Sequence, residues 1–231
     1  MTPRRLVLFG EGEGEEKALP ELVKKLLNQY NGRDALFVDK DVFRTGDIFK
    51  LAKDDFSNWK RWVQAAIKRP NVGAILVVSD GDADHYPAGS RNHFCAWTVA
   101  VELASQAAIH HGAGKGFSLA AVVACQEYES WLIAGTSSLA GKKMSDGRTA
   151  LRSGTTAPGN NLELAPRDAK GWLSKQMPNG YKASIDQVEL TRLVELEVIR
   201  QRGMRSFKRL EDAVRELIEA NRSGRHVCTP A

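Results

Sequence analysis

The chain has 231 residues, which is enough for one large domain, or one domain with an appendage, and too short for a machine of several domains. Hydrophobic residues make up 42% and charged residues 26%, so the chain can bury a sizeable core and disorder as its main state is excluded. Its 33 Lys and Arg against 28 Asp and Glu give a net charge of +5, which permits contact with a polyanion without requiring it.

The cysteines and the N-terminal segment indicate the compartment. The three cysteines are widely spaced, so the sequence predicts neither a disulfide framework nor a thiolate zinc site. The apolar stretch near the N-terminus is too short for a signal peptide, and no apolar run approaches the ~18 residues of a membrane span. We therefore expect a soluble, cytoplasmic protein.

Short apolar runs alternate with helical patterns along the first half of the chain. The runs at residues 6–9, 35–38, 72–78 and 117–124 predict strands. Apolar residues recur at i, i+3, i+4 and i+7 in residues 19–27 and 59–67, and residues 93–111 are apolar and rich in Ala. Strands without alternation, separated by helices, are typical of a parallel sheet buried on both faces. We expect an α/β fold with a mainly parallel, Rossmann-like sheet flanked by helices.

The pattern changes after this first half. Residues 136–165 are dense in Gly, Ser, Thr and Asn, which predicts a long loop or linker. Helical patterns return at residues 166–177 and 190–200, and again after Ser206, the expected N-cap of a helix that ends at Ser223 and Gly224. We expect an α/β domain over residues 1–135 and a helical C-terminal segment over residues 166–231, packed on the same domain.

The chain has five tryptophans, Trp59, Trp62, Trp97, Trp131 and Trp172. Most of them lie on apolar helical stripes, so we expect core positions for them, with stacking against nucleic-acid bases as the alternative.

Acidic residues follow three of the expected strands. They are Glu11, Glu13, Glu15 and Glu16 after the first strand, Asp80, Asp82 and Asp84 after the third, and Glu127 and Glu129 after the fourth. In an open parallel sheet ligands bind beyond the carboxyl ends of the strands, so these side chains should converge on one edge. Converging carboxylates raise one another's pKa values unless a cation neutralises them. Oxygen ligands without paired His or Cys favour Mg²⁺ or Mn²⁺ over zinc.

Each acidic cluster also has a purely structural interpretation. Asp80 and Gly81 form a common turn dipeptide, and Glu15 and Glu16 favour the start of a helix through its dipole. The glycine-rich run after the first strand could instead cradle a phosphate, although its pattern is not the dinucleotide fingerprint and its glutamates would repel an anion. Acidic residues at three separate strand ends together favour a metal site.

The acidic motifs carry a family resemblance. A strand that ends in Glu-Gly, a second that ends in Asp-x-Asp and a later acid resemble TOPRIM domains, which occur in topoisomerases, primases and a class of nucleases. More closely, FGEGEGE (9–15), SDGDAD (79–84) and QEYESWLIA (126–134) resemble the domain-of-unknown-function family numbered 4276. The similarity continues through PRDAKGWL (166–173), Tyr181, Asp186-Gln187 and Ser206-Phe207, and so spans nearly the whole chain.

This resemblance implies a TOPRIM-like fold and a place among bacterial and phage-defence genes, often beside an ATPase partner. Glu11 and Glu15, in the form Glu-Gly-x-x-Glu, resemble the nuclease branch of TOPRIM proteins, in which both acids serve the metal site.

The sequence therefore predicts a Mg²⁺- or Mn²⁺-dependent nuclease. The expected ligands of one or two ions are Glu11, Glu15, Asp80 and Asp82, with Asp84, Glu127 and Glu129 as secondary candidates. Glu11 is also a catalytic candidate, and so is Lys170, whose ammonium would stabilise negative charge on a phosphate if the C-terminal helices fold over the acidic edge. The residues expected to bind DNA or another nucleic acid are Lys182, Arg205 and Arg209.

Two other functions remain open at this point. The chain could be a non-catalytic TOPRIM-like partner subunit of an ATPase, which metal binding by the isolated protein would distinguish. It could also hydrolyse a small nucleotide, which would require an enclosed pocket around the same acids. A topoisomerase or primase is less compatible, because the length leaves no room for a gate or motor domain and no tyrosine stands out as a nucleophile.

Overall fold

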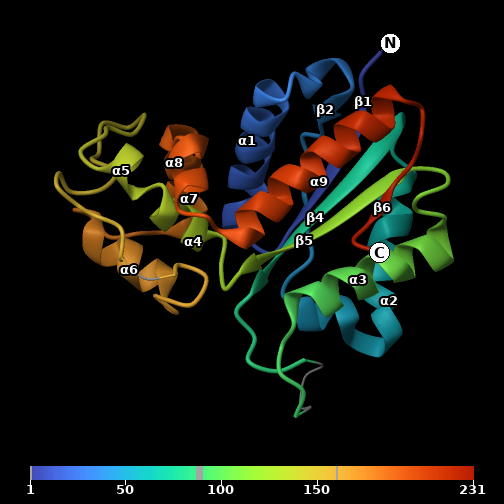
Figure 1. Ribbon diagram of the computed structural model, residues 1–231, viewed down its shortest axis with the longest axis horizontal. Helices are drawn as coiled ribbons and strands as arrows, with labels where there is room; N and C mark the ends of the chain where they lie inside the picture. The colour runs from blue at the N-terminus through green and yellow to red at the C-terminus, as the bar shows by residue number, and fades with distance from the viewer. Residues whose placement is uncertain (1, 87–90, 160) are drawn as a thin grey trace.

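A six-stranded sheet forms the centre of the protein in the computed structural model, which describes residues 2–86, 91–159 and 161–231 (Figure 1). The strands are β1 (Arg4–Gly10), β2 (Leu36–Val38), β3 (Phe43–Arg44), β4 (Val72–Gly81), β5 (Ser118–Cys125) and β6 (Cys228–Thr229). Their order is β2-β1-β4-β5-β6, and β3 also pairs with β1. All of these strand pairs are parallel, which confirms the α/β, Rossmann-like sheet.

Helices cover both faces of the sheet. Helices α1 (Glu13–Gln29) and α9 (Arg205–Arg222) lie on one face, and α2 (Ile48–Ile67) and α3 (Ala96–His111) lie on the other (Figure 1). Leu8 of β1 packs in the core under α1 and α9, whereas the next residue, Phe9, packs against Trp59 of α2. Because successive strand residues face opposite layers and both layers are apolar, the strands appear in the sequence as continuous apolar runs.

The remaining helices gather beyond the carboxyl ends of the strands (Figure 1). They are α4 (Glu129–Ala134), α5 (Thr136–Leu139), α6 (Ala169–Gln176), α7 (Ala183–Leu193) and α8 (Leu196–Gln201). Trp131 of α4 ties them to the main body: its Nε1 donates to Ser206 Oγ at 3.1 Å, and its ring meets Phe207 edge-on. Among the described residues, no helix is both long and apolar enough to span a membrane.

The described residues of the segment 136–165, which are 136–159 and 161–165, pack onto this body. Their backbone is largely irregular, as expected of a loop, but the segment includes α5 and an isolated bridge between Ala140 and Leu151. Met144, Ala150 and Leu151 are buried in the same core as α1 and the sheet. These apolar residues do not recur at the spacing of a helix or a strand, so the sequence pattern alone does not show that they are buried in the core.

Several elements differ from the sequence expectations. Strands β3 and β6 have only two residues each, too few to form a pattern. The helix expected at residues 190–200 is in fact the end of α7 and all of α8, separated by extended backbone at Val194 and Glu195. Helix α2 contains non-helical backbone at residues 53–56, and its second half matches the expected helix.

Two residue-level expectations were wrong. The N-cap of α9 is Met204, because the helix already begins at Arg205, and the Ser206 hydroxyl accepts from Trp131 instead of capping. Trp97 lies near the start of α3 with 58% of its surface exposed, whereas Trp59 and Trp131 are buried as expected.

The contrast between two tryptophans provides a test of this packing. We expect Trp131→Ala to lower the free energy of unfolding by about 3–5 kcal/mol, because it leaves a cavity and removes the partner of Ser206. Trp97→Ala should change it by about 0.5 kcal/mol or less, because the ring is exposed. Urea unfolding measures both, and similar losses in the two variants would contradict the placement of α4 against α9.

Candidate metal centre

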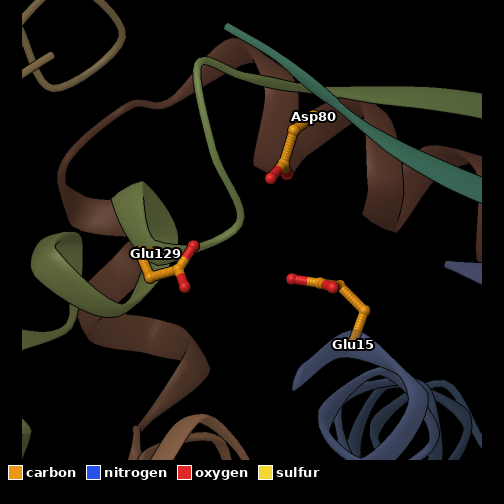
Figure 2. Close-up of side chains that lie close together, drawn as sticks. All are labelled: Glu15, Asp80 and Glu129. Atoms are coloured by element: carbon orange, nitrogen blue, oxygen red, sulfur yellow. The ribbon is translucent and has the colours of Figure 1, made fainter. Parts of the chain in front are cut away.

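Three buried carboxylates from separate elements face one another at the carboxyl edge of the sheet (Figure 2). Glu15 belongs to the first turn of α1, Asp80 to the end of β4, and Glu129 is the first residue of α4. One oxygen from each lies within 4.8 Å of the others. The exposed fractions are 6%, 6% and 0%. We call these three residues the acidic triad.

Local structure determines the position of each member of the triad. Glu15 Oε2 accepts from the Gly12 N–H at 2.8 Å, as in a capping box at the start of α1. Asp80 Oδ1 accepts from the backbone N–H of Tyr128 at 2.9 Å, which ties the end of β4 to the turn after β5. Glu129 is held by the Tyr181 hydroxyl, which donates to its Oε1 at 2.9 Å. Each carboxylate retains capacity for a further partner.

A close approach between α1 and α7 adds a second donor to Glu15. Gln187 Nε2 of α7 donates to Glu15 Oε1 at 2.9 Å. A Cβ atom on Gly14 would lie 1.7 Å from Gln187 Oε1, so the absence of a side chain at Gly14 leaves room for the Gln187 amide in this position. The glycine-rich segment therefore makes room for a hydrogen-bond donor from the second half of the chain.

Glu11 lies beside the triad. Its Oε2 accepts from the Asp80 N–H at 3.2 Å. Burial, with the carboxylates of Asp82 and Glu15, raises the pKa of Glu11 from its ordinary value of 4.5 to about 7, and the hydrogen bond from Asp80 only partly opposes the rise. Glu11 therefore keeps its proton to a higher pH than an exposed glutamate does.

The electrostatics of the triad favour a cation. Burial raises the pKa of Asp80, and the charges of Glu11 and Glu129 raise it further. Burial also raises the pKa of Glu129, although Lys170 and Tyr181 act in the opposite direction. Within the described part of the chain, Glu129 Oε2 is buried and accepts no hydrogen bond. A buried carboxylate oxygen that has only an ion pair with Lys170, at 3.5 Å, and lies among other carboxylates suits a hard divalent cation.

Lys170 of α6 brings a positive charge to this edge. Its Nζ lies 2.7 Å from Glu127 Oε1 and 3.5 Å from Glu129 Oε2. Burial alone would lower the pKa of Lys170, but the charge of Glu129 and the hydrogen bond to Glu127 outweigh it and raise the pKa above its ordinary value. The ammonium therefore stays charged beside the triad.

The other predicted ligands lie outside the triad. Asp82 follows the end of β4 and is exposed, although its charge still acts on Glu11. Asp84 is also exposed and pairs with Arg167 at 2.6 Å. Glu127 is the partner of Lys170.

The predicted nucleic-acid-binding residues are distributed over two helices. Lys182 is exposed, and its backbone N–H donates to Asp186 at the start of α7. Arg205 is exposed at the start of α9. Arg209 is half-buried, pairs with Glu216 at 3.1 Å and donates to Thr229 Oγ1 at 2.7 Å.

Sequence reasoning did not assign roles to Tyr181 and Gln187, the donors to Glu129 and Glu15. Both residues occur in the motifs that carry the family resemblance, which was the available signal. Burial and the charge of Glu129 raise the pKa of Tyr181, so its phenol remains a hydrogen-bond donor.

The raised pKa of Glu11 predicts a pH dependence in metal-free protein. A carboxyl group with a raised folded-state pKa stabilises the fold below its unfolded pKa, and this contribution is lost as pH rises through the folded pKa. Relative to Glu11→Gln, the unfolding free energy of wild type should therefore fall between pH 4.5 and about 7, by at most about 1.4 kcal/mol per pH unit. Urea unfolding in EDTA measures this difference, and a difference independent of pH would contradict the burial of Glu11.

Comparison with known proteins identifies a family. No curated protein and no solved structure shows significant similarity to the chain. One family profile, described as Domain of unknown function (DUF4276), matches residues 10–215, which include every acid of the triad as well as Lys170, Tyr181 and Gln187. The chain therefore belongs to the DUF4276 family.

Proposed function

We propose that the protein is a metal-dependent enzyme that cleaves phosphodiester bonds, of the TOPRIM-like nuclease type, and that Mg²⁺ or Mn²⁺ binds at the acidic triad. The observation that carries the proposal is the burial of Glu15, Asp80 and Glu129 with their carboxylate oxygens within 4.8 Å of one another. Such a group of acids is costly to desolvate without a cation, and perturbed carboxyl groups of this kind cluster at functional sites.

The donor set supports the choice of metal. The triad offers only carboxylate oxygens, and the hydrogen bonds from Gly12, Gln187, Tyr128 and Tyr181 orient them. Hard oxygen ligands suit Mg²⁺ or Mn²⁺. When bound, such an ion would polarise a phosphate and lower the pKa of water.

Two further residues supply functions that a phosphodiesterase needs. Glu11 lies beside the triad, with its carboxylate against the Asp80 N–H, and is our candidate for the general base that takes a proton from the attacking water. The Lys170 ammonium is placed to stabilise the negative charge that develops on the phosphate.

A nucleic-acid substrate is the part of the proposal that rests on charge and resemblance. The net charge of +5 and the exposed Lys182 and Arg205 favour a polyanion. The resemblance to the nuclease branch of TOPRIM proteins makes DNA the substrate to test first, and the family resemblance adds a role in phage defence beside an ATPase partner.

Metal binding is testable with two glutamates of the same helical turn. Mn²⁺ at about a hundred times its Kd should stabilise the wild-type fold by about 2.7 kcal/mol and raise its Tm. Glu15→Gln should lose most of this rise, because it removes a member of the triad. Glu13→Gln should keep it, because Glu13 is exposed and pairs only weakly with Lys17. Thermal unfolding with and without Mn²⁺ measures the rise in Tm. An equal rise in the two variants would mean that the ion binds elsewhere.

Cleavage of supercoiled plasmid in Mg²⁺ tests the activity. We expect wild type to nick the plasmid, Asp80→Asn to be inactive, and Lys170→Ala to be slower by about 10²–10³-fold. Asp34→Asn serves as the control, because this exposed acid precedes β2, at the opposite edge of the sheet, and pairs with Arg222.

The failures of this assay are informative. Hydrolysis of bis(p-nitrophenyl) phosphate without cleavage of DNA would favour a small-nucleotide enzyme. Metal binding or cleavage that survives Asp80→Asn would contradict the proposed site. Absence of both metal binding and cleavage would favour a non-catalytic partner subunit.

A further inference from the structure

The ammonium group of Lys170 lies at the carboxyl edge of the sheet and contacts the carboxylates of Glu127 and Glu129. Nζ is 2.7 Å from Glu127 Oε1 and 3.5 Å from Glu129 Oε2. Glu129 is also a member of the acidic triad, so the ammonium and the triad share it. In sites with two metal ions, the second ion lies about 3.5–4 Å from the first, and the two stabilise opposite sides of the reacting phosphate. Lys170 resembles such a second cation in one respect: its positive charge lies beside a carboxylate, Glu129, that also belongs to the triad.

Each of these two carboxylates has one oxygen that accepts no hydrogen bond. Within the described residues, Glu127 Oε2 and Glu129 Oε2 are buried and accept no hydrogen bond. Only 12% of the Glu127 side chain is exposed, so water can hydrate little of its negative charge. These two carboxylates therefore have the capacity to hold a cation, and Lys170 supplies a single positive charge there.

Like-charge repulsion limits how many ions the region holds while Lys170 is present. When ionised, the triad, Glu11, Glu127 and Lys170 together carry four net negative charges. One divalent cation at the triad reduces this to two negative charges. A second divalent cation at Glu127 and Glu129 would lie beside the Lys170 ammonium, which like-charge repulsion disfavours.

We propose that the site binds one divalent cation, at the acidic triad, and that the Lys170 ammonium takes the place of a second. The inference rests on the proposed function, since both require a cation at the triad. It adds that the chemistry uses one metal ion and one fixed ammonium, and that removing the ammonium opens a second metal position at Glu127 and Glu129.

The test is a Mn²⁺ titration of metal-free protein, with free Mn²⁺ followed by electron paramagnetic resonance. We expect one Mn²⁺ per chain in wild type and two in Lys170→Met, which keeps the length of the side chain and removes its charge. The second ion should also produce the signal of a spin-coupled pair. Lys170→Arg keeps a cation and should bind one. Lys175→Met should also bind one, because Lys175 is exposed on the same helix.

Each outcome separates the inference from the proposed function. Two Mn²⁺ in wild type would overturn the inference and leave the metal-dependent function standing. One Mn²⁺ in a folded Lys170→Met would also overturn it, because the ammonium would then not occupy a cation position. No Mn²⁺ in wild type would overturn the proposed function itself. If Lys170→Met does not fold, the counts in wild type and Lys170→Arg decide, with two ions in either contradicting the inference.

Discussion

The burial of like charges at the carboxyl edge of the sheet is the constraint on which the surrounding structure depends. Glu15, Asp80 and Glu129 are each at most 6% exposed, and burial raises the pKa values of Asp80 and Glu129. Such a cluster persists only when the surrounding structure supplies donors and positive charge. The helices beyond the strand ends meet that demand, because they carry Gln187, Tyr181 and Lys170 to the carboxylates.

This constraint makes the two halves of the chain interdependent. The sheet and α1 provide Asp80 and Glu15, while α6, α7 and the segment between them provide the donors. Two packing contacts hold these elements in place. Trp131 of α4 packs against Phe207 of α9, and Gly14 of α1 leaves room for the Gln187 side chain of α7. The helical C-terminal segment is therefore part of the site as well as part of the core.

The sheet and its long helices were predictable, because burial on both faces and a helical period leave strong patterns. Val72–Gly81 and Ser118–Cys125 are buried along nearly their whole length, so their apolar runs were unambiguous. The expectations that were wrong concern single residues whose contacts depend on other elements. Ser206 has the chemistry of an N-cap, yet its hydroxyl accepts from a tryptophan that is distant in sequence. Trp97, in the first turn of α3, is exposed, whereas the buried residues of this helix begin at Val99 and Ala100.

The gathering of acids at one edge follows from the order of strands and acids along the chain, because parallel strands place all their carboxyl ends on the same side of the sheet. Which of these acids meet depends on how the elements pack. Asp80 and Asp82 would share a face if the strand continued, but β4 ends at Gly81 and Asp82 reaches solvent, while Glu129 is buried at the start of α4. Side-chain periodicity relates residues within one element. Lys170, Tyr181 and Gln187 reach the carboxylates because elements far apart in the chain pack together. Local sequence patterns do not contain information about this packing.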